Sequence, residues 1–415
     1  MTRTSFEICI ICFILIFLVS SANLYGAEYR GYIYMDDYYS NDSSSAYDFN
    51  ILTTRMRMDV NKLKEIEGLS FHFDGREKNN FTSQDYSSRT KNTRIDTMNI
   101  EYSEKGRFNL SAGRLWPKEL PTERVDGINI LLNQNNSGVG IFGGAKPDPY
   151  TEEFNSNFTS MGGYIYYHKV NLSANLAITQ NEYKGDTDRQ YMYTQLTYSP
   201  SEKINIYGSI TADINQSTDN LDLTNLMIDL SYRPDNRKGL SFGYTQFRSF
   251  QLYSSMDFEI EKSQQQQYYV RGDYQFLDRY SIYGRYELQT LYYKLIEEEL
   301  RDSDTYQIGI RENNLLNQKI SLDINTTFVD SYSSNYITYN LQMSRIFNEV
   351  FQLNVNGSYM ENSYELTGYT DKITGYDISG YYTMNRWWNF SLSIEGRHAE
   401  EYDTSSIFTR ISYRF

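Results

Sequence analysis

Few residues of this chain have the type and spacing that catalysis requires. Its only histidines are His72, His168 and His398, and none lies in an H-E-x-x-H zinc motif or in another spaced set of metal ligands. A G-x-S-x-G pattern occurs once, at residues 239–243, but it lies inside a segment of strand-like alternation and not at the strand-to-helix turn that presents a nucleophilic serine in many hydrolases. The sequence therefore predicts that the protein is not an enzyme.

Metal and cofactor sites have as little support as catalysis. Asp186 with Asp188, and Asp302 with Asp304, offer two carboxylates per pair. Ca²⁺ takes roughly six to eight oxygen ligands, so two carboxylates alone are weak evidence for a site. The chain has no C-x-x-C-H motif for attaching a c-type haem. We therefore expect no catalytic residues, no metal and no cofactor.

Residues 1–27 differ from everything that follows them. Arg3 precedes an apolar run over residues 8–19, and small residues follow that run. This order is typical of a secretory signal peptide, and we expect cleavage after Ala22 or Ala27. The two cysteines of the chain lie inside the apolar run and would leave with it. Residues 28–415 are then expected to form a single domain without thiols.

The overall composition excludes several classes of protein. An aromatic content of 16% is too high for a disordered chain. After residue 19 no apolar run approaches the roughly 20 residues that a membrane-spanning helix needs. A net charge of -14 makes binding to nucleic acid unfavourable, so no nucleic-acid partner is expected.

Alternation of apolar and polar side chains recurs along the whole chain after residue 28. In residues 204–214, Ile204, Ile206, Ile210 and Ile214 share one parity, and the other parity is mostly polar. Residues 320–328, 388–397 and 407–415 show the same pattern. Because successive side chains of a strand point to opposite faces, these segments are predicted strands with one apolar face. Charges in the middle of the polar faces disfavour a dry core on that side.

The connections between these segments alternate in length. The short ones are 103–107, 199–203, 233–238, 276–280, 346–350 and 383–387. The long ones are 76–92, 146–160, 249–267, 295–304 and 361–375. Several aromatic residues lie next to the short turns, as in a girdle at a membrane boundary: Tyr198, Tyr232, Phe276, Phe347, Trp388 and Tyr413. We count about 22 antiparallel strands, or 18 to 20 if weak segments merge.

Together these features resemble the bacterial outer-membrane β-barrel family, porin-like in general form. The resemblance covers the whole mature chain and is strongest at its end, IFTRISYRF, where Ile411, Tyr413 and Phe415 alternate with polar residues. In that family a terminal aromatic residue after such alternation is the signal that the barrel-assembly machinery recognises. The resemblance implies an all-β, up-and-down transmembrane barrel in the Gram-negative outer membrane, in contact with outer-membrane lipid. Short turns would then face the periplasm and long loops the exterior.

The polar faces of the predicted strands supply candidate residues for lining a pore. They are Arg55, Arg57, Asp59, Asp213, Asp229, Arg271, Asp273, Arg285, Glu287, Asp323, Glu395, Arg397 and Arg410. Two proline-bearing loops, 114–127 and 146–160, are candidates for a constriction folded into the barrel, because proline stops a strand from continuing. Acidic loops at residues 259–263 and 295–304 would favour cations in the outer vestibule.

Two functions fit such a barrel. The first is a channel for passive diffusion of small hydrophilic solutes or ions. The alternative is a structural sleeve in a transenvelope complex, such as a porin-cytochrome electron conduit, in which a periplasmic or extracellular partner, for example a multihaem cytochrome, would bring the haem. Surface adhesion through tyrosine-rich loops is a third possibility. The sequence does not identify the solute, the partner or the oligomeric state.

Overall fold

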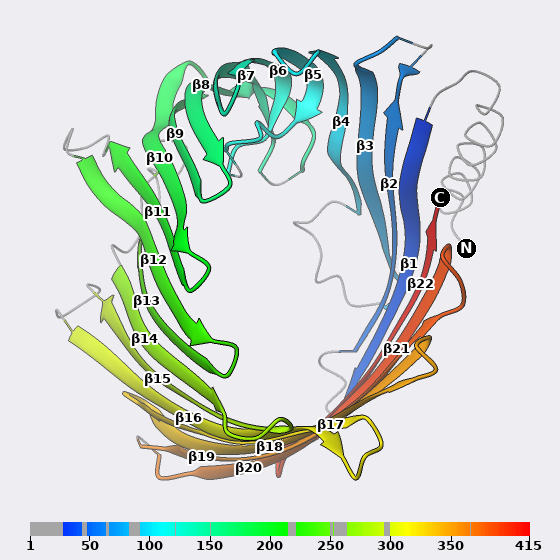
Figure 1. Cartoon of the computed structure of the whole chain (residues 1–415), viewed down its shortest axis with the longest axis vertical. Helices are drawn as coiled ribbons and strands as arrows, with labels where there is room; N and C mark the ends of the chain where they lie inside the picture. The colour runs from blue at the N-terminus through cyan, green and yellow to red at the C-terminus, as the bar shows by residue number, and fades with distance from the viewer. Residues whose placement is uncertain are drawn as a thin grey trace.

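A computed structural model of the chain is a closed β-barrel (Figure 1). The structure describes residues 28–43, 48–63, 66–82, 92–120, 122–149, 151–214, 221–249, 252, 264–293, 299–365 and 367–415. The predicted signal peptide and its cleavage site lie outside the described residues. None of the described segments is a helix long and apolar enough to cross a membrane.

The barrel is built from 22 strands in chain order. They are β1 (Glu28–Asp42), β2 (Phe49–Asn61), β3 (Leu69–Asn80), β4 (Thr93–Glu104), β5 (Phe108–Leu115), β6 (Val125–Gln134), β7 (Ser137–Pro147), β8 (Phe154–Lys169), β9 (Leu172–Tyr183), β10 (Asp186–Ser201), β11 (Ile204–Ile214), β12 (Leu221–Asp235), β13 (Lys238–Arg248), β14 (Gln264–Gln275), β15 (Tyr280–Tyr293), β16 (Glu299–Leu315), β17 (Ile320–Ser331), β18 (Ser334–Phe347), β19 (Phe351–Tyr364), β20 (Thr370–Thr383), β21 (Trp388–His398) and β22 (Asp403–Arg414).

Each strand pairs antiparallel with its neighbours in sequence, and the first strand pairs with the last. At this seam Asp36 of β1 lies opposite Arg410 of β22, and Ile33 lies opposite Tyr413. The closed ladder leaves no strand edge without a hydrogen-bonding partner, which is the condition for a sheet to exist in hydrocarbon. The predicted all-β, up-and-down barrel and its count of about 22 strands are confirmed.

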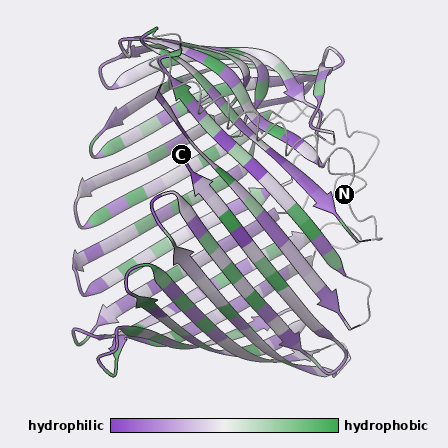
Figure 2. Ribbon diagram, turned by 90° about the vertical axis from the view of Figure 1, so that its right-hand side faces the viewer, coloured by the Kyte–Doolittle hydropathy of each residue, from purple (hydrophilic) through white to green (hydrophobic). Residues whose placement is uncertain are grey.

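The two faces of the wall differ in polarity, as the alternating colours of the strands in Figure 2 show. Leu392 and Ile394 of β21 are exposed on the apolar face, at 45% and 36% of their surface. Ser391 and Ser393 occupy the alternate positions, and Ser391 lies opposite Arg410. The apolar face therefore points outward toward lipid, and the polar face lines the lumen.

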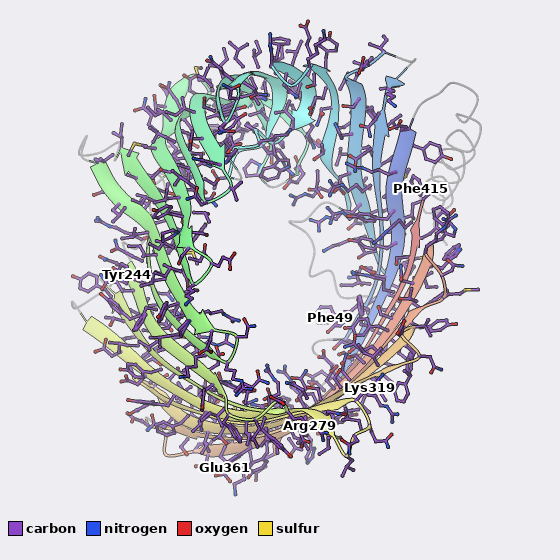
Figure 3. The ribbon with its side chains drawn as sticks, viewed as in Figure 1. Phe49, Tyr244, Arg279, Lys319, Glu361 and Phe415 are labelled. Carbon is purple, nitrogen blue, oxygen red and sulfur yellow. The ribbon has the colours of Figure 1, made fainter. Side chains whose placement is uncertain are left out.

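Aromatic rings mark both ends of the outer face. At the end that holds the chain termini, the ring centroid of Tyr413 lies 4.7 Å from that of Trp388 and 6.1 Å from that of Phe415. Toward the other end, Tyr244 lies 4.7 Å from Tyr268 on the neighbouring strand. Figure 3 shows Tyr244 on the outside of the wall. Such rings favour the boundary between headgroups and hydrocarbon.

Short and long connections lie mostly at the two ends of the barrel where the sequence predicts them, but some strands are longer than predicted. Most connections at the termini end are short, among them 105–107, 202–203 and 236–237, whereas the β2–β3 connection spans residues 62–68. At the opposite end two connections are also short, 184–185 and 332–333. Residues 299–304, expected in a loop, belong to β16, because their backbone continues the ladder to β15. The strands therefore extend further toward the exterior than side-chain alternation indicated.

The orientation of the faces can be tested with single cysteines, because the mature chain is predicted to have none. Cysteines replacing Ser391 and Ser393 are expected to react with a charged, membrane-impermeant maleimide in the folded barrel. Cysteines replacing Leu392 and Ile394 are expected to react only after the protein is unfolded. The reverse pattern would mean that the polar face points to lipid. Mass spectrometry of the labelled protein reads out both sites.

Candidate functional site: an inward loop and the polar lumen

The connection between β5 and β6 does not cap the barrel but folds into it. The segment from Trp116 to Arg124 lies inside the ring, beneath β5 to β7 in Figure 1. Pro117 ends the ladder of β5, and its carbonyl accepts a hydrogen bond from Leu120 N at 3.0 Å. Leu120 O in turn accepts from Glu123 N at 3.2 Å, so two tight turns follow one another. We call residues 116–124 the inward loop.

Apolar side chains hold the inward loop against the inner wall. Leu120 is fully buried, and Val125, the first residue of β6, is fully buried as well. They belong to one cluster with Leu115, Leu131, Phe142, Tyr164, Ala177, Tyr191 and Tyr193, contributed by the inner faces of β5 to β10. Burying a leucine of this size stabilises a fold by roughly 2 kcal/mol. The loop is thus packed against the wall and does not lie loose in the lumen.

A buried carboxylate makes the main polar attachment of the inward loop. Glu123 is 1% exposed and accepts hydrogen bonds from Tyr191 Oη at 2.7 Å and Ser160 Oγ at 3.1 Å. Asn181 Nδ2 donates to it at 3.2 Å, and Lys146 Nζ lies 3.3 Å away. Three strands, β8 to β10, and the end of β7 therefore converge on one side chain. A second acid of the loop, Glu119, accepts from Nδ2 of Asn175 through its backbone oxygen at 3.2 Å and pairs with His168 Nε2 at 3.2 Å.

Arginine–carboxylate pairs connect the inward loop to β4 on one side and to the β7–β8 connection on the other. Arg124 pairs with Asp96 of β4 at 3.3 Å and with Glu152 of the β7–β8 connection. Glu152 also pairs with Arg94 at 3.1 Å. Burial, together with the neighbouring guanidinium groups of Arg94 and Arg114, lowers the pKa of Arg124 to about 10, so Arg124 stays charged at neutral pH. Both proline-bearing loops thus meet in one ionic network.

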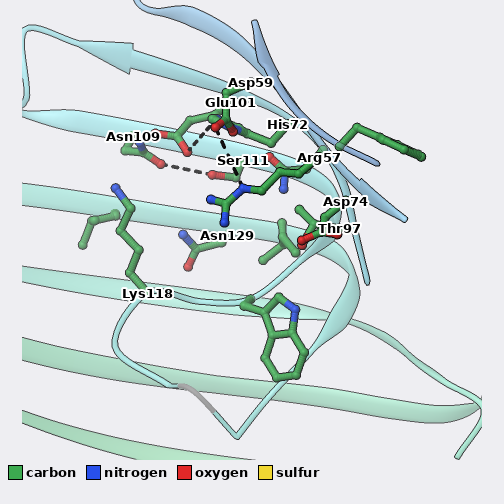
Figure 4. A pocket seen from close by; sticks show the side chains of 15 residues that line it. Arg57, Asp59, His72, Asp74, Thr97, Glu101, Asn109, Ser111, Lys118 and Asn129 are labelled. Carbon is green, nitrogen blue, oxygen red and sulfur yellow. Dashed lines mark hydrogen bonds and ion pairs between the residues drawn. The ribbon is translucent and has the colours of Figure 1, made fainter. Parts of the chain in front are cut away.

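Beside the inward loop, the inner wall of β2 to β6 is hollowed into a polar pocket of about 320 Å³ (Figure 4). Its wall carries His72, whose Nδ1 lies 2.7 Å from Asp59, and Arg57, which lies 4.0 Å from the same carboxylate. The loop contributes Trp116 and Lys118, both exposed toward the lumen. The pocket offers charges of both signs and one aromatic face to a solute passing the loop.

The predicted pore-lining residues lie on the polar face, most of them in pairs with neighbours. Arg55 pairs with Asp74, Asp213 with Arg189, Arg285 with Glu287, Asp323 with Arg311, and Arg410 with Asp36. Asp229 accepts a hydrogen bond from Tyr269, Arg271 lies opposite Arg285, and Asp273 lies opposite Gly239. Glu395 and Arg397 line another polar pocket, on β19 to β21. Whether these residues face a conducting pore stays a prediction.

Sequence reasoning missed the residues that attach the inward loop. Glu119 and Glu123 lie in a segment without alternation, so parity assigned them to neither face. The only signal was the pair Pro117 and Pro121, which marked the segment as a candidate constriction. Among the described residues, no group of three or more His, Cys, Asp and Glu side chains is arranged to hold a metal ion.

The assembly-signal residues lie at the barrel seam. The ring of Phe415 is tilted against that of Tyr29 of β1, with ring centroids 6.2 Å apart, and its backbone N donates to Gly31 O at 3.0 Å. Ile411 and Tyr413 lie opposite Met35 and Ile33 of β1. All three lie on the outer face of the seam at which the last strand, β22, pairs with the first strand, β1. Their recognition by the assembly machinery stays a prediction.

Comparison with known proteins finds similar structures but no similar sequences. No protein-family model matches the chain, and no curated protein matches it. Among solved structures, Pseudomonas aeruginosa OccK3 (OpdO) has a TM-score of 0.48 at 8% identity, over 94% of this chain and 96% of that chain. The BenF-like porin from Pseudomonas fluorescens Pf-5 has a TM-score of 0.48 at 9% identity, over 94% and 98%. Acinetobacter baumannii OccAB4 has 0.47 at 9%, over 94% and 98%. At these values the likeness does not bear on the function of this chain.

The chain's own geometry places it in a membrane. Its outer face is apolar around the closed wall, with aromatic rings at both ends, and its backbone ladder is complete without water. Bacterial barrels of this kind reside in the outer membrane. The protein is a closed, 22-stranded antiparallel β-barrel of the bacterial outer membrane, with one loop folded into its lumen.

Proposed function

We propose that the barrel is a channel through which small hydrophilic solutes or ions diffuse across the outer membrane. The observation that carries the proposal is the polar inner wall narrowed by a firmly attached loop. Barrels of 16 to 18 strands already leave an aqueous passage, and a 22-stranded barrel is wider. A loop held by Glu123 and Arg124 narrows such a passage at a fixed place, which gives a diffusion channel its size limit.

The paired charges on the wall support passage of water-soluble molecules. Arg55 binds Asp74 with two hydrogen bonds, of 2.6 and 2.7 Å, and Arg410 binds Asp36 in the same way. Pairs of this kind neutralise the wall without making it apolar, so neither ions nor neutral solutes meet a high barrier. The acidic segments expected to favour cations lie largely outside the described residues, and the cation preference stays a prediction.

The sleeve alternative has no observation in its favour. The inward loop occupies part of the lumen that a partner protein threaded through the barrel would otherwise fill. Removing the loop from the wall would expose Leu120 and leave Glu123 without its partners. A cytochrome partner therefore stays an untested prediction from the sequence.

Planar-bilayer recording of the purified barrel tests the channel directly. Steady single-channel currents of uniform size in KCl are expected, and vesicles containing the barrel should swell in isotonic glucose. A correctly folded barrel that conducts no ions and admits no glucose would overturn the proposal. Copurification of haem with such a silent barrel would favour the sleeve instead.

A further inference from the structure

The wall opposite the inward loop has a different character from the rest of the lumen. In Figure 1, β17 to β20 lie across the lumen from β5 to β8. The inward positions of β18 between Tyr336 and Ser344, and of β19 between Gln352 and Asn362, carry no charged residue. Amide and hydroxyl side chains occupy most of them. We call Asn325, Asn340, Gln342, Ser344, Asn354, Asn356 and Ser358 the amide strip.

Hydrogen bonds join members of the amide strip across neighbouring strands. Asn340 Nδ2 donates to Asn325 Oδ1 at 3.1 Å, and Ser344 Oγ donates to Asn354 Oδ1 at 2.7 Å. Asn354 Nδ2 donates onward to Ser379 Oγ of β20 at 3.3 Å. These bonds fix the orientation of the side chains that make them. The strip is therefore an ordered surface, and a solute meets fixed hydrogen-bonding groups there.

Two amides at the centre of the strip are available for a solute. Gln342 and Asn356 lie directly opposite each other on β18 and β19. Among the residues that the structure describes, neither side chain has a hydrogen-bond partner, and Gln342 is exposed to the lumen. Opposite side chains of antiparallel strands are about 5 Å apart at Cβ. Each amide offers two donors and an acceptor with two lone pairs.

A polar pocket of about 450 Å³ begins at Asn356 and continues toward β21. Ser358 and Ser379 line it together with Asp377, whose Oδ2 accepts a hydrogen bond from Ser393 Oγ at 2.7 Å. Glu395 and Arg397 stand at its far side and bring one charge of each sign. The pocket is therefore rich in groups that bond hydroxyls, and its charged groups are two carboxylates, Asp377 and Glu395, and one guanidinium, Arg397.

We propose that the amide strip, centred on Gln342 and Asn356, is a weak binding site for neutral polyhydroxylated solutes such as sugars. A hydroxyl group donates and accepts at once, as an amide does, so several adjacent hydroxyls can bond this surface. The inward positions of β18 and β19 offer an ion no charge, and the nearest carboxylates are Asp323, opposite Gln342, and Asp377, opposite Asn356. Arg311 and Ser393 already bond these two acids, whose oxygens can also accept hydrogen bonds from hydroxyl groups. Weak binding suits conduction, since a solute must be held well enough to enter and loosely enough to leave. This inference rests on the proposed channel function.

The test uses three solutes of matched size: glucose, gluconate and glucosamine, which are neutral, anionic and cationic. In vesicle swelling, the barrel is expected to admit glucose faster than either charged analogue. In the double variant Gln342→Leu/Asn356→Leu this preference is expected to fall about tenfold, because two amides that each bond a hydroxyl are lost. Ion conductance in KCl should change little, since no charge is altered.

A matched control replaces one asparagine and one glutamine in another part of the lumen. Asn225 of β12 and Gln289 of β15 are half-buried inward amides, and Asn225→Leu/Gln289→Leu should keep the preference for glucose. If the control lowers the preference as much as the double variant does, or if neither lowers it, the amide strip is not a binding site. A barrel that conducts KCl but does not favour glucose overturns this inference alone. A barrel silent in KCl overturns the channel proposal and this inference together.

Discussion

Replacing residues 116–124 with a short glycine-serine linker is expected to raise the single-channel conductance in KCl about threefold, because the loop fills part of the cross-section that the 22-stranded wall encloses. The loop is packed on the inner faces of β5 to β10, so its removal widens the passage at that level and nowhere else. Larger sugars should also enter vesicles faster. Planar-bilayer recording and vesicle swelling measure the two effects.

A second shortened connection controls for general damage to the barrel. The β21–β22 connection, residues 399–402, lies at the same end of the barrel, and its shortening should leave the conductance unchanged. If deletion of the inward loop also leaves the conductance unchanged, the narrowest part of the passage lies elsewhere. Both variants must show the far-ultraviolet spectrum of the intact barrel before the currents are compared.

The strands were predictable because their signal is local. In β11, Ile204, Ile206 and Ile210 alternate with polar residues, and a two-residue period alone assigns the faces. Each strand needs only its own ten or so residues for that assignment. The same reasoning gave the strand count and the side of the short turns. It failed where strands continue past the apolar band, as in residues 299–304 of β16.

The site was less predictable because its contacts join distant parts of the chain. Arg410 was a candidate from its parity, yet its partner Asp36 is 374 residues away. Glu123 bonds Ser160 and Asn181, 37 and 58 residues further on. The prolines indicated that the β5–β6 segment is not a strand, but they do not say whether such a loop folds inward or outward. The buried partners of Glu123 on β8 to β10 show that the loop folds inward.

The attachment of the inward loop through Glu123 gives the second large expected effect. Glu123→Leu is expected to release the loop and give a noisy channel whose mean conductance approaches that of the loop deletion. The change leaves Tyr191 and Asn181 without their acceptor, at a cost of about 1 to 3 kcal/mol for each buried group, and it takes the counter-ion from Lys146, whose side chain is 30% exposed. The barrel itself should stay folded, since its backbone ladder does not depend on this side chain.

Two further variants separate loss of the attachment from loss of a lumen charge. Glu287→Leu removes an acid that bonds Gln267 and Arg285 on the inner wall of β14 and β15, and its current should stay quiet. Tyr191→Phe removes one hydrogen bond to Glu123 and should give a milder noise than Glu123→Leu. In a barrel that already lacks residues 116–124, Tyr191→Phe should have no effect on the current, because its partner is gone. Equal noise from Tyr191→Phe in both backgrounds would show that the fluctuations arise in the wall and that Glu123 does not hold the loop.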